Sequence, residues 1–180
     1  PLAKRTVEGE LGVYVNMPNI VEVRGKDKLR EELQIDIDKV MAEYKAIPKN
    51  PDEIKFVERL TLEAVIKAVE RHAGKIRYVY GPSGRNTLAE GKDLSQVKYI
   101  IGTGGALTRL PNRVDIMKHI ARHNDSGLLL FPNTDAQILV ENDYIMASLG
   151  VLSKRHEKAA MKLLAKSLGI EMPEKKRSEQ

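Results

Sequence analysis

Short apolar segments alternate with longer amphipathic segments along residues 51–170, and this alternation restricts the fold more than any other feature of the sequence. Strands are predicted at 75–80, 97–102 and 127–131, and residues 136–140 are either a further short strand or a bridging segment. Helices are predicted between and after these strands. The pattern indicates the α/β fold class.

The longest predicted helix begins after Asn50, which is a favourable N-cap residue. Pro51 suits the first helical position, and Glu53 stands three residues after the cap, as in a capping box. Apolar residues then recur every three or four positions, and Gly74 suits the position that follows a helix end. We therefore predict a long amphipathic helix with a structural role that ends just before Gly74.

The chain divides into four predicted regions. Residues 1–15 begin the main lobe with a strand and a turn, and residues 16–50 form a small helical subdomain with two short helices at 26–44. Residues 51–172 form the rest of the main lobe. Residues 173–180 are predicted to be a disordered tail that is fully solvated.

The remaining segments are read from their turn and cap residues. Turn-forming residues dominate 81–93, so this segment is predicted to be a loop. Asn142 or Asp143 is expected to cap a helix over 144–153, and a last helix is expected over 156–169.

Composition is that of an ordinary soluble globular protein, with 42% hydrophobic and 31% charged residues. Thirty Lys and Arg against 25 Asp and Glu give a net charge of +5, and aromatic residues make up only 4%. Nucleic-acid binders concentrate basic charge on one face or interleave it with stacking aromatics, so no nucleic-acid partner is predicted. Because there is no cysteine, no long apolar run and no apolar leader, we expect a cytoplasmic protein that does not enter a membrane.

The segment YIIGTGGALTRLPNR (99–113) places Gly-Thr-Gly-Gly (102–105) where a predicted strand ends and a helix begins. Backbone N–H groups at such a junction face outward, and absent side chains let an anion or a sugar come close. The segment does not match the dinucleotide fingerprint, since Leu107 occupies the third glycine position, and it lacks the Gly-Lys-Ser/Thr of a P-loop. From the residues alone, a nucleotide contact and a purely architectural turn both stay open.

Other candidate residues carry weaker signals. Ser83, Gly84 and Arg85 could hold a phosphate or carboxylate, but a plain hairpin or surface loop is the favoured explanation. His119 and His123 share a helix face without a third metal ligand. The small residues within 147–150 predict close packing, either against the glycine turn or at an ordinary helix crossing. No catalytic residue and no metal ligand is therefore assigned to this chain.

Three long segments carry a resemblance to a known family: KRTVEGELGVYVN (4–16), ERHAGKIRYVYGPSGRNTLAEGKDLSQVKYIIGTGGALTRLPNR (70–113) and DYIMASLGVLSKRHEKAAMKLLAKSLGI (143–170). They resemble the glutamate mutase L family, whose members are like the reactivating factors of adenosylcobalamin-dependent mutases. These are distinct from the DNA mismatch-repair proteins that share a similar short name. The resemblance covers nearly the whole chain.

The resemblance implies a fold and a binding site. The family looks like the actin, Hsp70 and sugar-kinase ATPases, which implies the C-terminal lobe of an actin/Hsp70-like ATPase with a ribonuclease H-like fold and a small helical satellite subdomain. GTGGALTRLP is similar to the adenosine-binding turn of Hsp70-like proteins, with one additional residue before Thr108-Arg109. The nucleotide-binding residues implied by the resemblance are Gly102, Thr103, Gly104, Gly105, Ala106 and Arg109.

The resemblance also implies that part of the ATPase lies outside this chain. The sequence contains neither Asp-x-Gly-x-Thr nor Asp-x-Gly-Gly, the phosphate loops whose carboxylates coordinate Mg²⁺ and position water in such ATPases. The implied cofactor, ATP with Mg²⁺, would then need the missing N-terminal half of the same protein, and Pro1 in place of Met agrees with an excised piece. A full-length member is expected to be an ATPase, whereas this chain alone is not expected to be catalytic.

The leading interpretation is the nucleotide-binding lobe of an ATP-dependent reactivating chaperone, whose partners are subunits of an adenosylcobalamin-dependent mutase. One alternative is a non-catalytic interaction module that docks on a mutase subunit through residues 16–50, with the glycine turn purely architectural. Another is a lobe of a related small-molecule kinase, which would need substrate residues from the absent half.

Overall fold

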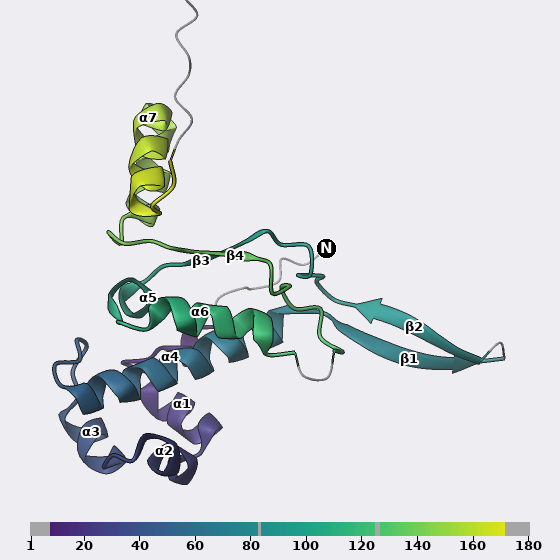
Figure 1. Cartoon of the computed structure of the whole chain (residues 1–180), viewed down its shortest axis with the longest axis horizontal. Helices are drawn as coiled ribbons and strands as arrows, with labels where there is room; N and C mark the ends of the chain where they lie inside the picture. The colour runs from purple at the N-terminus through teal and green to yellow at the C-terminus, as the bar shows by residue number, and fades with distance from the viewer. Residues whose placement is uncertain (1–7, 83, 125–126, 172–180) are drawn as a thin grey trace, which may run out of the picture.

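The computed structural model describes residues 8–82, 84–124 and 127–171. A hairpin and a kinked helix project from its body in different directions (Figure 1). The elements in chain order are η1 Gly9–Leu11, α1 Met17–Arg24, α2 Lys26–Leu33, α3 Ile37–Glu43, α4 Pro51–His72, β1 Lys75–Gly81, β2 Gly84–Glu90, β3 Tyr99–Gly102, α5 Gly105–Arg109, α6 Arg113–Arg122, β4 Gln137–Val140 and α7 Met146–Ser167. The described residues form a mixed α/β structure with two two-stranded sheets.

Three helices lie within residues 16–50. α2 and α3 confirm the two short helices predicted at 26–44. The sequence does not predict α1, because its eight residues have little amphipathic character, although Pro18 suits its first turn. Residues 1–7 lie outside the described residues, so the strand predicted near the beginning of the chain is largely untested. The turn that follows them is the short 3₁₀ helix η1.

α4 confirms the capping prediction. The backbone N–H of Glu53 donates to Asn50 Oδ1 at 2.9 Å, and the Glu53 carboxylate accepts from the Asn50 amide at 3.0 Å and from the backbone N–H of Lys49 at 2.5 Å. The bond to Asn50 Oδ1 satisfies one of the N–H groups that a helix start leaves without partners, and the other two hold the Glu53 side chain at the cap. Phe56 and Leu60, on the face that turns inward, are completely buried.

One hydrophobic core joins the N-terminal helices to α4, α5 and α6. Its buried members are Leu11, Ile20, Val21, Leu29, Ile37, Val40, Tyr44, Phe56, Val57, Leu60, Ala64, Leu110 and Ile116. These residues come from both sides of the predicted boundary between residues 50 and 51. The glycine turn before α5 is therefore attached to the same packed core as the N-terminal helices.

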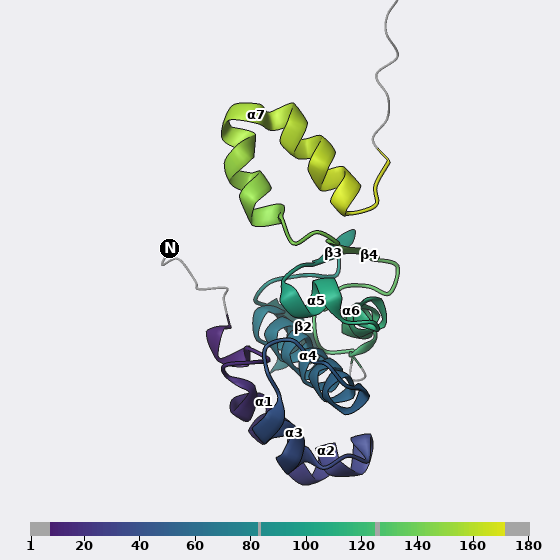
Figure 2. The ribbon, with the colours of Figure 1, turned by 90° about the vertical axis from the view of Figure 1, so that its left-hand side faces the viewer.

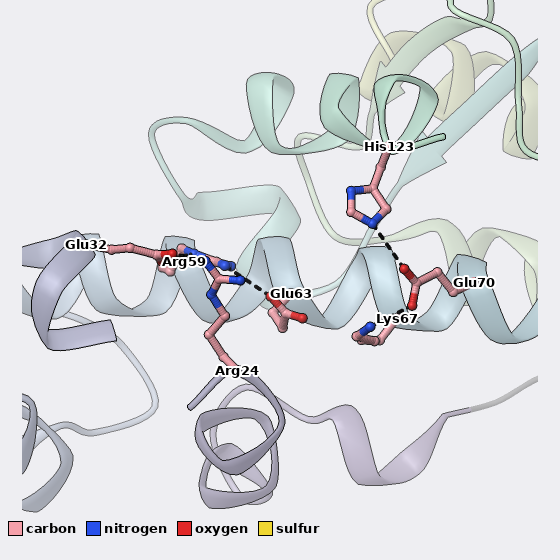
Figure 3. Close-up of polar contacts among 7 residues, drawn as sticks. All are labelled: Arg24, Glu32, Arg59, Glu63, Lys67, Glu70 and His123. Carbon is pink, nitrogen blue, oxygen red and sulfur yellow. Dashed lines mark hydrogen bonds and ion pairs between the residues drawn. The ribbon is translucent and has the colours of Figure 1, made fainter. Parts of the chain in front are cut away.

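Arg59 joins α2 to the middle of α4 (Figure 3). Its guanidinium donates to Glu32 on α2 at 2.9 Å and to Glu63, one turn further along α4, at 3.1 Å. Arg24, at the end of α1, also pairs with Glu32. The side chains of Arg59 and Glu63 are only 16% and 11% exposed, so water and salt screen this contact less than an ordinary surface ion pair.

Glu70 anchors the end of α6 to α4 (Figure 3). It accepts from Lys67 at 2.8 Å and contacts Nε2 of His123, the residue that follows α6, at 3.1 Å. Burial raises the pKa of the Glu70 carboxyl, but the contacts with Lys67 and His123 lower it by more than burial raises it. The pKa of Glu70 therefore lies below the ordinary value. The carboxylate therefore stays ionised at neutral pH.

β1 confirms the predicted strand at 75–80, but its partner β2 lies in a segment predicted to be a loop. The two strands pair antiparallel from Lys75 and Glu90 to Gly81 and Gly84, and the hairpin projects from the body (Figure 1). The loop prediction for 81–93 is wrong because β2 lacks an apolar alternation of its own and becomes extended by pairing with β1.

Gly74 follows α4, as predicted, for a different physical reason. It does not adopt a left-handed conformation. A Cβ on Gly74 would lie 2.5 Å from the carbonyl oxygen of Glu90, and a Cβ on Gly91 would lie 2.8 Å from the Gly74 Cα. The two glycines therefore let the base of the hairpin pass directly against the end of the helix.

β3 and β4 form a parallel pair whose register runs from Tyr99 with Gln137 to Gly102 with Val140. The sequence leaves open whether residues 136–140 form a strand or a bridging segment, and the structure shows that they contain the strand β4. The strand predicted at 127–131 is wrong, since this segment makes an isolated bridge from Leu129 to Lys75. Its residues extend the base of the hairpin instead of joining β3 and β4.

α7 contains both helices predicted after residue 143. His156 has φ −135° and ψ 56°, which are not helical, and the two halves fold back on each other at this kink (Figure 2). The end of α7 returns to its beginning, because the backbone N–H and the side-chain amide of Asn142 donate to the Ser167 carbonyl at 3.0 and 2.9 Å. The helix stands off the body of the molecule in both views (Figures 1 and 2).

Candidate functional site

Each glycine of the turn between β3 and α5 has its own reason to be glycine. A Cβ on Gly102 would lie 3.3 Å from the side chain of Met117 on α6, so this glycine permits close packing. Gly104 has φ +95°, a conformation that other residues rarely adopt. A Cβ on Gly104 or Gly105 would meet no atom within 4 Å. The backbone at the start of α5 is therefore open to an approaching molecule.

The start of α5 borders a pocket of about 660 Å³. Gly105, Ala106 and Arg109 line it, which brings three of the six predicted nucleotide-binding residues together. The other lining residues come from the chain before α1, the loop before α4, α4 itself and the segment that follows α5: Gly9, Gly12, Val13, Tyr14, Val15, Asn16, Tyr44, Ala46, Ile47, Pro48, Ile54, Val57, Leu110 and Pro111. Most of these side chains are apolar, so the pocket suits a largely apolar or planar group.

Two tyrosines form an aromatic wall of this pocket. The rings of Tyr14 and Tyr44 meet edge to face with centroids 5.6 Å apart, and Tyr44 in turn contacts Phe56 in the core at 6.4 Å. Burial raises the pKa of the Tyr44 hydroxyl, and the neighbouring Tyr14 and Glu53 raise it further. The Tyr44 hydroxyl therefore stays protonated at neutral pH and can donate a hydrogen bond.

Arg109 brings a cation to the pocket. Its side chain is exposed, and it has no hydrogen-bond or ion-pair partner within the described part of the chain. The guanidinium is therefore available to a ligand, either to stack on a planar ring or to pair with an anion.

The other three predicted residues, Gly102, Thr103 and Gly104, lie on the turn beside the pocket and are not part of its lining. The Thr103 hydroxyl donates to the carboxylate of Glu141 instead of pointing to a ligand. The amide N–H of Glu141 also donates to the carbonyl of Gly102 at 2.9 Å. The first half of the turn is therefore held by the segment that follows β4.

Glu141 is a buried carboxylate that the sequence analysis does not single out. It is completely buried and accepts hydrogen bonds from the Thr103 hydroxyl and from the backbone N–H groups of Ile145 and Met146. Burial raises the pKa of the carboxyl, but the bond from Thr103 and the two backbone bonds outweigh it, so the pKa lies below the ordinary value. One ionised side chain thus connects the glycine turn to the start of α7.

A signal for Glu141 exists in the register of the strands. Gly102 pairs with Val140, so the next residues, Thr103 and Glu141, leave the sheet at the same edge. The carboxyl ends of parallel strands are the usual place for functional side chains in α/β sheets. The sequence does not reveal that register, because it leaves open whether residues 136–140 form a strand.

Two expectations about α7 are wrong. Neither Asn142 nor Asp143 caps the helix, since Ile145 occupies the N-cap position and Glu141 accepts from the first N–H groups. The small residues at its start do not pack against the glycine turn, because a Cβ on Gly150 would meet no atom within 4 Å. The buried carboxylate of Glu141 caps the helix because it accepts from two N–H groups at the start of α7 that have no partner within the helix.

The weaker candidates of the sequence do not form a second site. Ser83 lies outside the described residues, and Arg85 lies 4.5 Å from the Tyr78 ring on the hairpin. Among the described residues, no three His, Asp or Glu side chains gather as a metal site. No helix in the same residues is long and apolar enough to cross a membrane.

Comparison with known proteins relates nearly the whole chain to one family. A family model described as MutL protein matches residues 1–168. The chain is similar to Protein MutL of Clostridium tetanomorphum, with 34% identity over 175 residues that cover 93% of this chain. It spans only 38% of the length of that relative. No solved structure matches the chain.

Proposed function

The chain belongs to the MutL (glutamate mutase L) family, and from this premise we propose that it is the adenosine-binding lobe of an ATP-dependent reactivating factor for an adenosylcobalamin-dependent mutase. The family is associated with glutamate mutase, so a mutase is the partner that the proposal names. In the proposed cycle, nucleotide binding and hydrolysis in the complete protein move two lobes and release damaged cobalamin from the mutase.

The observation that carries the proposal is the pocket shared by Gly105, Ala106, Arg109 and the two tyrosines. Its volume of about 660 Å³ falls among typical small-molecule sites. A purine base is planar and largely apolar on its faces, so aromatic rings and a guanidinium suit it. The open backbone at Gly105 leaves room for the attached ribose.

The described residues suit the nucleoside better than the phosphates. Gly105, Ala106 and Arg109 would hold the adenosine side, and no cluster of acidic side chains in the described residues suits Mg²⁺. When bound, Mg²⁺ neutralises the charge that develops on the phosphates. We propose that its ligands belong to the longer protein that the relative represents, and that this chain binds and orients the nucleotide.

Glu141 supports the site by fixing the turn. Its bonds to Thr103 and to the Ile145 and Met146 amides hold the end of β3 against the start of α7. A turn held in one conformation offers its backbone to a ligand without paying ordering entropy at the moment of binding. In the proposal, Thr103 therefore has a positioning role.

The proposal also includes the finer fold, an actin/Hsp70-like lobe with a helical satellite subdomain. Support comes from the parallel β3–β4 pair, from the glycine turn at the carboxyl end of β3 and from the pocket between that turn and the N-terminal helices. In open α/β sheets, ligands bind at the carboxyl ends of strands.

Calorimetric titration with ATP tests the proposal. We expect Gly105→Val to weaken ATP binding by about tenfold or more, since the added side chain would fill the opening between backbone and ribose. Gly150→Val is the matched control, because that glycine also has no neighbour within 4 Å of its Cβ position but lies far along the chain in α7.

Unchanged ATP affinity in Gly105→Val would remove the turn from the site. A parallel titration with purified glutamate mutase addresses the rival, in which residues 16–50 dock on the mutase. If the chain binds mutase equally with and without nucleotide and does not bind ATP, the interaction module is the better account.

A further inference from the structure

α7 carries a large positive charge that the rest of the described chain does not neutralise. It contains five basic residues and one acidic residue, Glu157; the basic residues are Lys154, Arg155, Lys158, Lys162 and Lys166. All five basic side chains are exposed, and none has an ion-pair partner within the described residues. This segment therefore offers its charge to another molecule.

The arginines on α1, α2 and α4 differ from the basic residues of α7. All four arginines on these helices are paired with carboxylates: Arg24, Arg30, Arg59 and Arg71. The basic residues of α7, in contrast, have no carboxylate partner in the described part of the chain. Uncompensated charge concentrated on one projecting element is typical of a surface that attracts an oppositely charged partner.

The second half of α7 shows the pattern most clearly. Lys158, Lys162 and Lys166 recur every four residues, so their side chains follow one another along a single face. Like charges at this spacing destabilise an isolated helix, and a row of carboxylates from a partner would remove that cost. Met161 and Leu163, which are 47% and 44% exposed, flank this lysine stripe.

The arrangement favours a protein partner over a membrane surface. A helix that lies in a membrane interface separates its apolar face from its basic face. In the second half of α7, Met161 and Leu163 lie on opposite sides of the lysine stripe, and in the first half Arg155 lies between Val151 and Leu152 on the helix surface. Because charged and apolar side chains are interleaved on α7, the helix lacks the separate apolar face that a membrane interface needs.

Access to this surface is open, because α7 stands off the body in both views (Figures 1 and 2). Its own end is fixed, since Asn142 holds the Ser167 carbonyl, so the two halves present a defined shape. We propose that the lysine stripe of α7, with Met161 and Leu163 beside it, is a docking surface for an acidic helix on a partner protein. The partner is recognised by carboxylates four residues apart with apolar side chains next to them.

Fluorescence anisotropy with a labelled synthetic peptide tests this proposal. The peptide is helical, with glutamates at every fourth position and leucines beside them. We expect the triple variant Lys158→Gln, Lys162→Gln, Lys166→Gln to bind the peptide about tenfold more weakly, and we expect wild-type binding to weaken as salt is raised. The paired variant Met161→Ser, Leu163→Ser is expected to lower the affinity without changing the salt dependence.

A charge-matched control removes three exposed lysines elsewhere, Lys28, Lys45 and Lys98, by changing each to Gln. Equal loss of affinity in this control would show a non-specific charge effect and would overturn the proposal. Tight binding to phosphatidylserine vesicles with no binding to the peptide would assign α7 to a membrane surface and would also overturn it. Since all the changed side chains are exposed, circular dichroism is expected to show every variant folded.

Discussion

At the scale of single residues, the glycines of this chain have different physical roles. Gly74 and Gly91 stand in backbone-to-backbone contact at the base of the hairpin, where a Cβ would meet backbone atoms closer than 3.0 Å. Gly150 stands within α7 with no neighbour within 4 Å of its Cβ position. Only the first pair needs to be glycine for packing.

Gly74→Ala and Gly150→Ala are therefore expected to change the free energy of unfolding in opposite directions. Gly74→Ala should destabilise the protein by about 2 kcal/mol, because backbone atoms must move to admit the methyl group. Gly150→Ala should stabilise α7 by roughly 0.5–1 kcal/mol, since alanine favours the helix. Urea unfolding followed by circular dichroism measures both. A Gly74→Ala variant as stable as the wild type would contradict the close contact.

At the scale of elements, Glu141 joins β3, β4 and α7. Its folded-state pKa lies below the value of an unfolded chain, so the ionised form stabilises the folded state. That stabilisation is present above the unfolded pKa of about 4.5 and is lost as the pH falls through the lower folded pKa. Acid is therefore expected to loosen the contact between the glycine turn and α7.

Glu141→Gln tests this connection. We expect the variant to be less stable by about 2 kcal/mol at pH 7, since hydrogen bonds to a charged acceptor are lost. The difference from the wild type should shrink as the pH falls below the unfolded pKa of about 4.5 and through the lower folded pKa, because the wild-type carboxyl then becomes neutral like the glutamine. Thr103→Val is the companion variant that removes one donor and leaves the charge. A stability difference that does not change with pH would show that Glu141 is not ionised in the folded state.

The elements that the sequence predicts well are those with local signals. Asn50, Pro51 and Glu53 specify the start of α4 through contacts within one turn, and the structure shows that cap. Two predictions are wrong for the same reason. The segment of β2 is expected to be a loop and is a strand, whereas 127–131 is expected to be a strand and is not. Pairing with another segment decides both, because β2 gains a complete partner in β1 whereas 127–131 gains an isolated bridge.

The candidate site is predictable in part. Gly104 and Gly105 are visible in the sequence because a turn from strand to helix needs such residues, and Arg109 follows at a fixed distance. Tyr14 and Tyr44 are not predictable, since they reach the pocket only through the packing of the N-terminal helices against α4. Glu141 depends on the register of β3 with β4, which no local pattern encodes.

At the scale of the whole molecule, one core holds the N-terminal helices, α4 and the turn together, while the β1–β2 hairpin and α7 project from it (Figure 1). The proposed nucleotide pocket lies within the packed body, and the proposed docking surface lies on a projecting helix. Binding of nucleotide and binding of a partner are thus assigned to different parts of the chain, with Glu141 at the connection between them.

Photolabelling can show whether adenosine binds between the glycine turn and the two tyrosines. The protein is irradiated with ATP that carries an azide on its adenine ring, and the modified peptides are identified by mass spectrometry. We expect adducts on peptides that contain Tyr14 or Tyr44, and excess unmodified ATP should abolish them. Adducts confined to other parts of the chain, or labelling that excess ATP does not reduce, would contradict binding there.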